Sequence, residues 1–205
     1  WFAAWDWAFL CIVFALIDPA FAKQQLLLLC SDQFISLQGQ IPAYEWSFGD
    51  VNPPVQAWAA WKVYQYEKQK TGQGDRDFLE QMFQKLQANY YWWLNREDKD
   101  NKNLFQGGFL GLDNITIFNR SVALPTGGYL QQSDGTAWMG MFSLNMMVIA
   151  LELGSYDRVY SQIALSFLRH FLNIAQAMDR VGSDHQLSLW DETEGFFFSA
   201  LTLPD

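Results

Sequence analysis

The stretch from Gly107 to Asn114 places one carboxylate, Asp113, in a glycine-rich and largely apolar loop between two helical regions. Apolar surroundings disfavour the charged form of a carboxyl group and raise its pKa. A proton donor that works near neutral pH needs a pKa raised in this way. Asp113 is therefore a candidate acid catalyst. The alternative is that Asp113 caps a turn that Asn114 continues.

A second candidate site is Trp5-Asp6-Trp7, early in a strongly apolar helix. A lone carboxylate is costly to bury, so Asp6 needs a partner or a ligand. Asp6 could accept hydrogen bonds from sugar hydroxyls while Trp5 stacks on a sugar ring. Alternatively, Asp6 is satisfied by backbone donors and by the dipole of its own helix.

The loop from Gly39 to Pro54 combines carboxylates, an amide and aromatic rings in a short span, and the residues of interest are Tyr44, Glu45, Trp46 and Asn52. Polar groups among aromatic faces are typical of a ligand site. Glycine and proline in a loop also serve simple turn geometry, which is the alternative interpretation here.

A fourth group precedes the apolar run that follows Gln132. Ser133 and Asp134 form a pattern that favours a helix cap. Together with Trp138, they could also line the mouth of a binding site. Both interpretations place these residues at the start of a helix.

Metal and cofactor sites are not predicted. His170 and His185 are isolated from each other and from cysteine, which gives neither a metal site nor a histidine-based triad. The run from Asp98 to Asn103 fails the EF-hand pattern because Lys102 takes a ligand position. There is no phosphate loop and no dinucleotide fingerprint in the sequence.

The composition of the chain indicates which classes of partner it can bind. The net charge is −9, with only 13 Lys and Arg residues, which argues against nucleic acid and disfavours an anionic membrane. The apolar run from Ala8 to Ile17 is about ten residues, well short of the roughly 20 that span a bilayer. Aromatic residues make up 17% of the chain and include ten Trp, which permits stacking on a carbohydrate.

The two cysteines, Cys11 and Cys30, lie in apolar helical stretches and are expected to act as small buried hydrophobes. Two cysteines do not make a disulfide framework, so they do not fix the cellular compartment of the protein. The cytoplasm is slightly favoured. The chain opens on Trp1 instead of Met. We therefore expect residues 1–205 to be one partial domain without an internal linker.

Hydrophobic periodicity and the helix-capping and helix-ending residues predict six helices in close pairs. Two long loops are expected at 33–52 and 96–132, and short extended pieces at 186–203. Such pairing suits helical hairpins stacked as an α-solenoid or a closed α/α toroid. No repeat of fixed period supports a regular solenoid. The expected helices cover residues 2–17, 19–31, 53–71, 75–95, 133–153 and 157–178.

Five segments, in order, resemble the glycoside hydrolase family 63 group, which contains processing oligosaccharide glucosidases and bacterial enzymes acting on mannosylglycerate or glucosylglycerate. They are Trp5-Asp6 with Ala15 to Pro19, Gly39 to Pro42, Asn52 to Val55 with Ala57-Trp58, Gly111 to Asn114, and Ser133 to Trp138. The resemblance implies an all-α, (α/α)6 toroid of helical hairpins. Six helices would form about half of it.

The resemblance also implies an inverting α-glycosidase without a cofactor, in which one carboxylic acid protonates the leaving oxygen and a second carboxylate activates water. It assigns the acid role to Asp113 and places Trp5 and Asp6 at the glycosyl subsite, with Asn52 at a polar position before the paired prolines. No base is found, because Glu192 and Glu194 fit a hairpin turn.

Two function hypotheses follow. The protein is a glycosidase whose base lies outside this chain, so that the chain alone is inactive. Alternatively, it is a non-catalytic helical module that binds carbohydrate or a protein partner. The sequence does not fix the sugar or the linkage.

Overall fold

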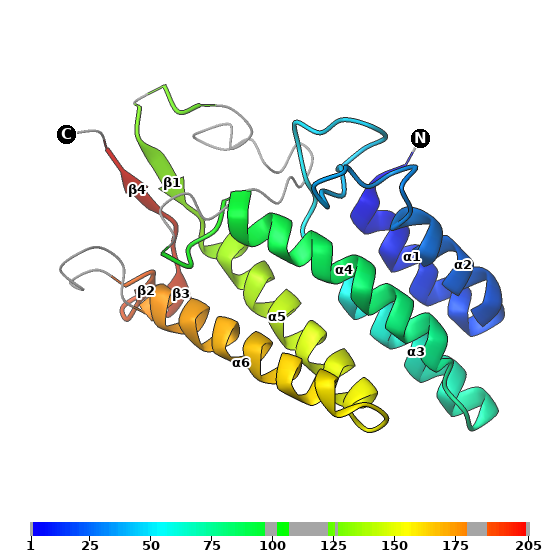
Figure 1. The fold of residues 1–205 in the computed structure, drawn as a ribbon. Coiled ribbons are helices and arrows are strands. Elements are labelled where there is room, and N and C mark those ends of the chain that lie inside the picture. The colour runs from blue at the N-terminus through cyan, green and yellow to red at the C-terminus, as the bar shows by residue number, and fades with distance from the viewer. Residues whose placement is uncertain (1, 97–101, 107–122, 126, 180–187, 204–205) are drawn as a thin grey trace.

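In a computed structural model, residues 2–96, 102–106, 123–125, 127–179 and 188–203 are described (Figure 1). They form six α-helices and four short strands. The helices are α1 (Ala4–Ile17), α2 (Pro19–Leu29), α3 (Gln56–Thr71), α4 (Arg76–Arg96), α5 (Ser133–Gly154) and α6 (Arg158–Asp179). The strands are β1 (Tyr129–Gln131), β2 (Trp190–Asp191), β3 (Phe196–Phe197) and β4 (Ala200–Thr202).

Local signals set several helix ends. The Asp18 carboxylate accepts the Phe21 N–H at 3.0 Å, directly before the proline that opens α2. The Asp75 carboxylate accepts the Phe78 N–H at 3.0 Å and caps α4. Gly72 ends α3 at φ +79°, a left-handed conformation that favours glycine. The six predicted helices are confirmed, with ends that shift by a few residues.

The predicted cap of α5 is wrong. Gln132 is the N-cap residue and makes no side-chain capping bond, so Ser133 and Asp134 lie inside the first turn. The Asp134 carboxylate accepts the N–H of the adjacent Gly135 at 2.8 Å. The Ser133 N–H instead donates to the Ser199 hydroxyl at 3.2 Å, so a distant segment satisfies it.

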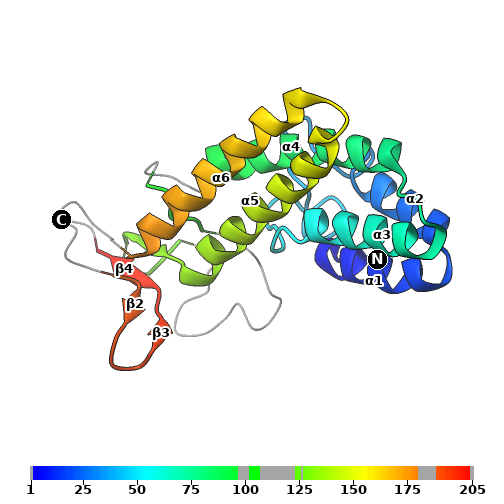
Figure 2. The same cartoon turned by 90° about the horizontal axis from the view of Figure 1, so that it is seen from below.

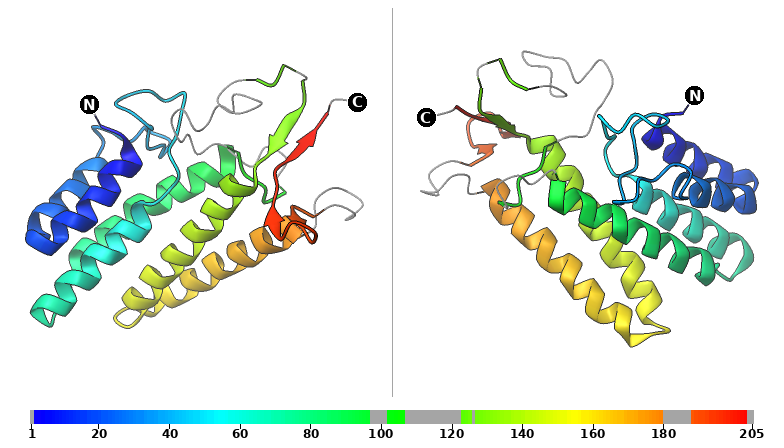
Figure 3. Two further views of the ribbon diagram at one scale, coloured as in Figure 1. Left: turned by 180° about the vertical axis from the view of Figure 1, so that it is seen from behind. Right: turned by 45° about the horizontal axis from the view of Figure 1, so that its top comes forward.

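The helices form three antiparallel hairpins, α1–α2, α3–α4 and α5–α6, arranged as two curved layers (Figures 2 and 3). α1, α3 and α5 contact each other in succession, and α2 and α4 also touch. Between α4 and α6, the Phe83 ring meets Tyr160 at 5.4 Å and Phe167 at 6.0 Å. This is a partial helical toroid, so the predicted all-α fold class is confirmed.

The core lies between the two layers and is rich in rings. Tyr90 is fully buried, packs edge-on against Phe142 at 5.1 Å, and shares a 2.7 Å hydrogen bond with the Ser143 hydroxyl. Cys11 and Cys30 are buried free thiols, and burial raises the pKa of each to about 12. Their predicted role as small buried hydrophobes is confirmed.

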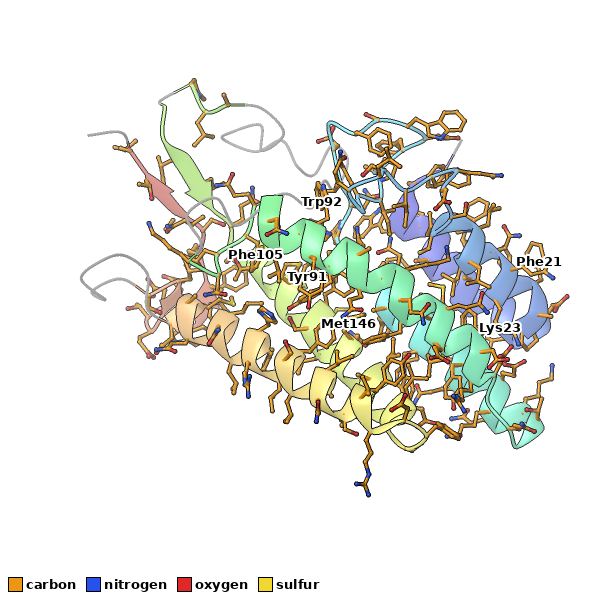
Figure 4. The ribbon with its side chains drawn as sticks, in the orientation of Figure 1. Phe21, Lys23, Tyr91, Trp92, Phe105 and Met146 are labelled. Atoms are coloured by element: carbon orange, nitrogen blue, oxygen red, sulfur yellow. The ribbon has the colours of Figure 1, made fainter. Side chains whose placement is uncertain are left out.

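Two polar clusters tie the helices at the end of the layers where α1 ends. Lys23 of α2 donates to the carboxylates of Glu67 and Asp75, at 2.7 Å each (Figure 4). Glu152 of α5 accepts from the Tyr64 hydroxyl at 2.6 Å and from the Lys68 ammonium at 2.5 Å. Both clusters join elements that are distant in sequence.

The strands form two small antiparallel ladders, β1 with β4 and β2 with β3. The predicted short extended pieces in the tail are confirmed as β2, β3 and β4. Glu192 and Glu194 lie in the exposed turn between β2 and β3, as expected, where the Asp191 carboxylate accepts the Glu194 N–H at 2.9 Å. The pairing of β1 with the tail was not predicted.

Candidate functional site

The N-terminal ends of α1, α3 and α5 all lie at one end of the helical layers, together with the loop between α2 and α3 (Figures 1 and 3). The N-terminal end of a helix presents unpaired N–H groups and partial positive charge. This end of the layers therefore carries three helix ends of the same polarity. Every predicted site residue that the structure describes lies at this end, which we call the loop end.

The first turn of α1 carries Trp5 and Asp6, and its N-cap, Ala3, makes no side-chain capping bond. The loop that follows α2 replaces the missing cap. The Ala4 N–H donates to the Ala43 carbonyl at 2.9 Å, and the Trp5 N–H donates to the Asn52 side-chain oxygen at 3.3 Å. The direction of this turn is therefore set by a distant segment.

The loop itself is anchored to α4 through Gly39, which has a φ of +94°. A Cβ at Gly39 would lie only 2.6 Å from the Ala88 carbonyl oxygen. The Asn89 side chain donates to the Gly39 carbonyl at 2.8 Å and is itself buried. Glycine is required here by both the backbone conformation and the close approach to α4.

Beside this loop lies an apolar pocket of about 290 Å³, lined by Phe2, Trp7, Leu28, Leu29, Phe34, Glu45 and Trp46. The Trp46 ring is 65% exposed, stacks on Phe34 at 6.4 Å, and its indole N–H donates to the Gln33 carbonyl at 2.8 Å. Trp46 holds a φ of +39°, which is unusual for a bulky residue and indicates local strain. The Glu45 carboxylate accepts the Phe2 N–H at 3.1 Å.

An aromatic row crosses from α1 to α3. Trp5 meets Phe9 at 6.0 Å, and Phe9 meets Trp58 at 5.7 Å, both edge-on. Asp6 is exposed beside this row. Phe9 and Trp58 were not among the predicted site residues, because apolar residues at helical spacing indicate a core face first.

At the start of α5, Ser133, Asp134 and Trp138 are all partly buried. The Ser133 hydroxyl lies 3.5 Å from both the Phe197 carbonyl and the Ser199 hydroxyl. The β2–β3 hairpin is therefore docked against the first turn of α5. Sequence reasoning missed Ser199, since no local pattern links it to α5.

Asp113 and Asn114 lie outside the described residues. On the N-terminal side of their segment, Phe105 is fully buried beside α5 (Figure 4). The Phe105 N–H donates to the Thr136 hydroxyl at 2.9 Å. The chain thus enters the segment that contains Asp113 from a fixed point at the loop end.

Two groups of predicted residues are brought together in this way: Trp5, Asp6, Tyr44, Glu45, Trp46 and Asn52 around the start of α1, and Ser133, Asp134 and Trp138 at the start of α5. Within the described ranges, no cluster of three or more His, Cys, Asp or Glu side chains is arranged to hold a metal ion. The arrangement offers carboxylates, amides and aromatic faces, which suit a polar ligand with apolar ring faces.

One described helix, α5, is long and apolar enough to cross a membrane by length and composition alone. It packs against α3, α4 and α6. Its contacts on several sides are those of a core helix in a helical layer.

Comparisons with known proteins agree with this geometry. Residues 1–120 match the model of the Mannosylglycerate hydrolase MGH1-like glycoside hydrolase domain. A Saccharomyces cerevisiae protein, "Uncharacterized protein YMR196W", is 49% identical over 214 residues. All of this chain is aligned, and it covers 20% of the yeast protein.

Solved structures share the fold. An uncharacterized conserved protein from Thermus thermophilus superposes with a TM-score of 0.70 at 17% identity, over 96% of this chain and 58% of its own. A GH63 mannosylglycerate hydrolase from the same organism, in complex with glucose, gives 0.67 at 15% identity, over 97% and 61%. The chain therefore spans about 60% of these solved chains and a fifth of the yeast relative.

Proposed function

Since the chain belongs to the Mannosylglycerate hydrolase MGH1-like glycoside hydrolase family, within glycoside hydrolase family 63, we propose that the full-length protein hydrolyses an α-glycosidic bond. The proposed mechanism is inverting, with Asp113 as the general acid and a base outside residues 1–205. Residues 1–205 would then be one partial catalytic domain. The chain alone is expected to be inactive, because an inverting enzyme needs both carboxyl groups.

The observation that supports this proposal is the fixed position of Phe105, which precedes Asp113 in the chain and whose N–H donates to the Thr136 hydroxyl in the first turn of α5, at the loop end. The Trp5–Asp6 turn and the Ser133–Asp134 turn lie at the same end (Figure 1). A sugar bound there would meet aromatic faces and polar groups from several elements.

In the proposed reaction, Asp113 donates its proton to the departing glycosidic oxygen while a water on the opposite ring face attacks the anomeric carbon. The two carboxyl groups of an inverting enzyme lie roughly 6.5–9.5 Å apart, which leaves room for that water. Asp6, Glu45 and Asp134 are proposed to accept hydrogen bonds from sugar hydroxyls. Asn114 and Ser133 are proposed as further polar contacts, and Tyr44, Trp46 and Trp138, with Trp5, as aromatic contacts.

The substrates to test first are chosen from the relatives. The solved GH63 mannosylglycerate hydrolase has been obtained in complex with glucose, and in complex with Tris and D-glycerate. We therefore take α-mannosylglycerate and α-glucosylglycerate as the first substrates to test. An oligosaccharide with an α-linked terminal glucose is the next class.

Asp113→Asn in the full-length protein tests the acid role. The expected result is a loss of hydrolysis of about 10²-fold to 10⁴-fold, the range for removing a general acid, with unchanged thermal unfolding. Asp32→Asn, an exposed loop acid, serves as the matched control and should retain activity. Proton NMR of the first product should show the β-anomer, which is the mark of inversion.

Near-normal turnover by Asp113→Asn would remove Asp113 from the mechanism. Release of the α-anomer as the first product would reject inversion while leaving hydrolysis intact. If the wild-type protein binds glucose without hydrolysing any α-glycoside, the non-catalytic carbohydrate-binding module becomes the better description.

A further inference from the structure

We propose that Asn52 is a positioning residue, which holds the first turn of α1 in place and thereby aims Trp5 and Asp6 at the bound sugar. This inference rests on the proposed glycosidase function, and it gives Asn52 a different role from the sugar contact expected from the sequence. The argument starts from the hydrogen bonds around the first turn of α1.

The amides of that first turn cannot be satisfied within α1. The first N–H groups of any helix lack an intrahelical acceptor, and Ala3 at the N-cap has no side chain that could supply one. The Ala43 carbonyl accepts from Ala4 at 2.9 Å, and Asn52 accepts from Trp5 at 3.3 Å. The loop thus caps α1 from positions 39 and 47 residues further along the chain.

The orientation of the Asn52 amide follows from this contact. The Trp5 backbone N–H can only donate, so the side-chain oxygen of Asn52 must face it. That oxygen accepts the hydrogen bond from the first turn of α1. Because Asn52 is only 5% exposed, a sugar at the loop end has little access to its side chain.

The segment around Asn52 is built to be rigid. Two prolines follow directly, and a proline restricts the preceding residue to extended conformations and fixes its own φ. Residues 51–57 are all buried, and the Val55 N–H donates to the Pro53 carbonyl at 3.0 Å. The acceptor that caps α1 is therefore held in position before any ligand arrives.

Gln56, the first residue of α3, provides a second tie. It is buried, and its side-chain N–H donates to the Ala4 carbonyl at 3.4 Å. Asn52 and Gln56 thus bind the same turn of α1, one through the Trp5 N–H and the other through the Ala4 carbonyl. The next residue of α1 after Trp5 is Asp6, which is exposed at the loop end. A shift of the turn would move both proposed sugar contacts together.

Two substitutions separate positioning from direct contact, tested in the full-length protein with α-mannosylglycerate as substrate. Asn52→Ala removes the acceptor, whereas Asn52→Asp keeps an oxygen in the same place and removes the amide donor. A carboxylate beside a helix N-terminus is also favoured by the dipole. Asn145→Ala, which removes a partly buried asparagine whose side chain donates to the Met141 carbonyl within α5, is the matched control.

The first readout is hydrogen exchange of the amides in residues 2–10. Asn52→Ala should accelerate their exchange by about 2-fold to 30-fold, which is the range expected for loss of a helix N-cap. Asn52→Asp should leave exchange near the wild-type rate, and Asn145→Ala should not change it selectively in this segment. Unchanged protection in Asn52→Ala would overturn the proposal whatever the protein hydrolyses, so this readout stands apart from the proposed function.

The second readout is a double-mutant cycle with Asp6→Asn. Asn52→Ala should lower kcat/KM by about 10-fold to 100-fold, the scale of a misplaced contact group, and Asn52→Asp should restore most of it. In the Asp6→Asn background the further loss caused by Asn52→Ala should shrink to the part that acts through Trp5, because Asn52 holds the turn that carries both contacts. Asn145→Ala should give the same factor in both backgrounds.

An Asn52→Asp variant as impaired as Asn52→Ala, with normal protection of residues 2–10, would show that the amide group itself contacts the sugar. Full additivity of Asn52→Ala with Asp6→Asn would also contradict the proposal.

Discussion

Replacing Lys23 with Met should show how strongly one partly buried cation joins three parts of the fold. Its ammonium donates to Glu67 of α3 and to Asp75 before α4, both at 2.7 Å. The side chains of Lys23 and Glu67 are only 14% and 17% exposed, whereas Asp75 is 36% exposed. Met keeps the apolar stem of the lysine and removes the charge.

The size of the effect follows from these exposures. At 2.7 Å and an effective dielectric constant near 20, each pair attracts by about 6 kcal/mol, most of which is offset by desolvation. Leaving the partly buried Glu67 carboxylate without its cation should cost about 2–3 kcal/mol, below the range for a fully buried pair. The partly exposed Asp75 should add up to about 1 kcal/mol. The Lys23→Met variant should therefore lose about 3 kcal/mol of local stability.

A companion variant isolates the cause. Lys23→Met with Glu67→Gln removes the stranded charge as well, so it should recover about 2 kcal/mol. Asp75 stays in both proteins because its carboxylate also caps α4. Lys70→Met, the same change at an exposed lysine of α3, should stay within about 0.5 kcal/mol.

The assay is urea unfolding of the full-length protein, read locally by hydrogen exchange of residues 19–29 in α2. A loss below about 1 kcal/mol for Lys23→Met would refute the reasoning, since it would mean that the ion pairs contribute little beyond their desolvation cost. Equal losses in the single and double variants would refute the role assigned to the stranded Glu67 charge.

Two further predictions concern the glycine anchor and the pH response. Gly39→Ala should cost more than about 2 kcal/mol and detach the loop from α4, because a Cβ would lie 2.6 Å from the Ala88 oxygen at a φ of +94°. The control is Gly49→Ala, since nothing lies within 4 Å of a Cβ at that position. Equal urea midpoints for the two variants would contradict the expectation. Burial lowers the pKa of His170 in the folded protein. Below about pH 6.5 the unfolded state therefore binds more protons than the folded state. The free energy of unfolding should fall as the pH drops from there towards the folded pKa. His170→Gln should flatten the change in urea midpoint between pH 7.5 and 5.5, and an unchanged slope would contradict it. Burial acts to raise the pKa values of Asp75 and Glu152, but a lysine together with further hydrogen-bond donors, the Phe78 N–H and the Tyr64 hydroxyl respectively, lowers both. Their lowered pKa values add a separate loss of stability below about pH 4.5.

Much of the helical frame could be predicted because its signals are local. Asp18 before Pro19, Gly72 after the third helix and Asp75 before the fourth each mark a boundary through their own side chain or backbone. The start of α5 was misassigned for the opposite reason. Its first free amide is satisfied by Ser199, which lies 66 residues further along the chain. No local pattern reports such a partner.

The candidate site divides in the same way. The types of residue at the start of α1 could be predicted as sugar contacts, because aromatic rings beside carboxylates suit that chemistry. Their arrangement could not be predicted, since the turn that carries Trp5 is capped by Ala43 and Asn52 from another segment. The pattern Asn52-Pro53-Pro54 indicated a polar residue at a rigid turn. Only the fold shows that its oxygen faces a backbone amide.

The difference between contact residues and positioning residues decides which substitutions can test the site. A residue that touches the sugar and a residue that aims such a contact can both lower activity, and the sequence pattern alone does not separate them. At the loop end the separation is physical: Asp6 is exposed, whereas Asn52 and Gln56 are buried and bonded to the turn that carries Asp6. Loss of Asp6 should therefore act on the sugar without loosening α1, and loss of Asn52 should act on the sugar only by loosening α1.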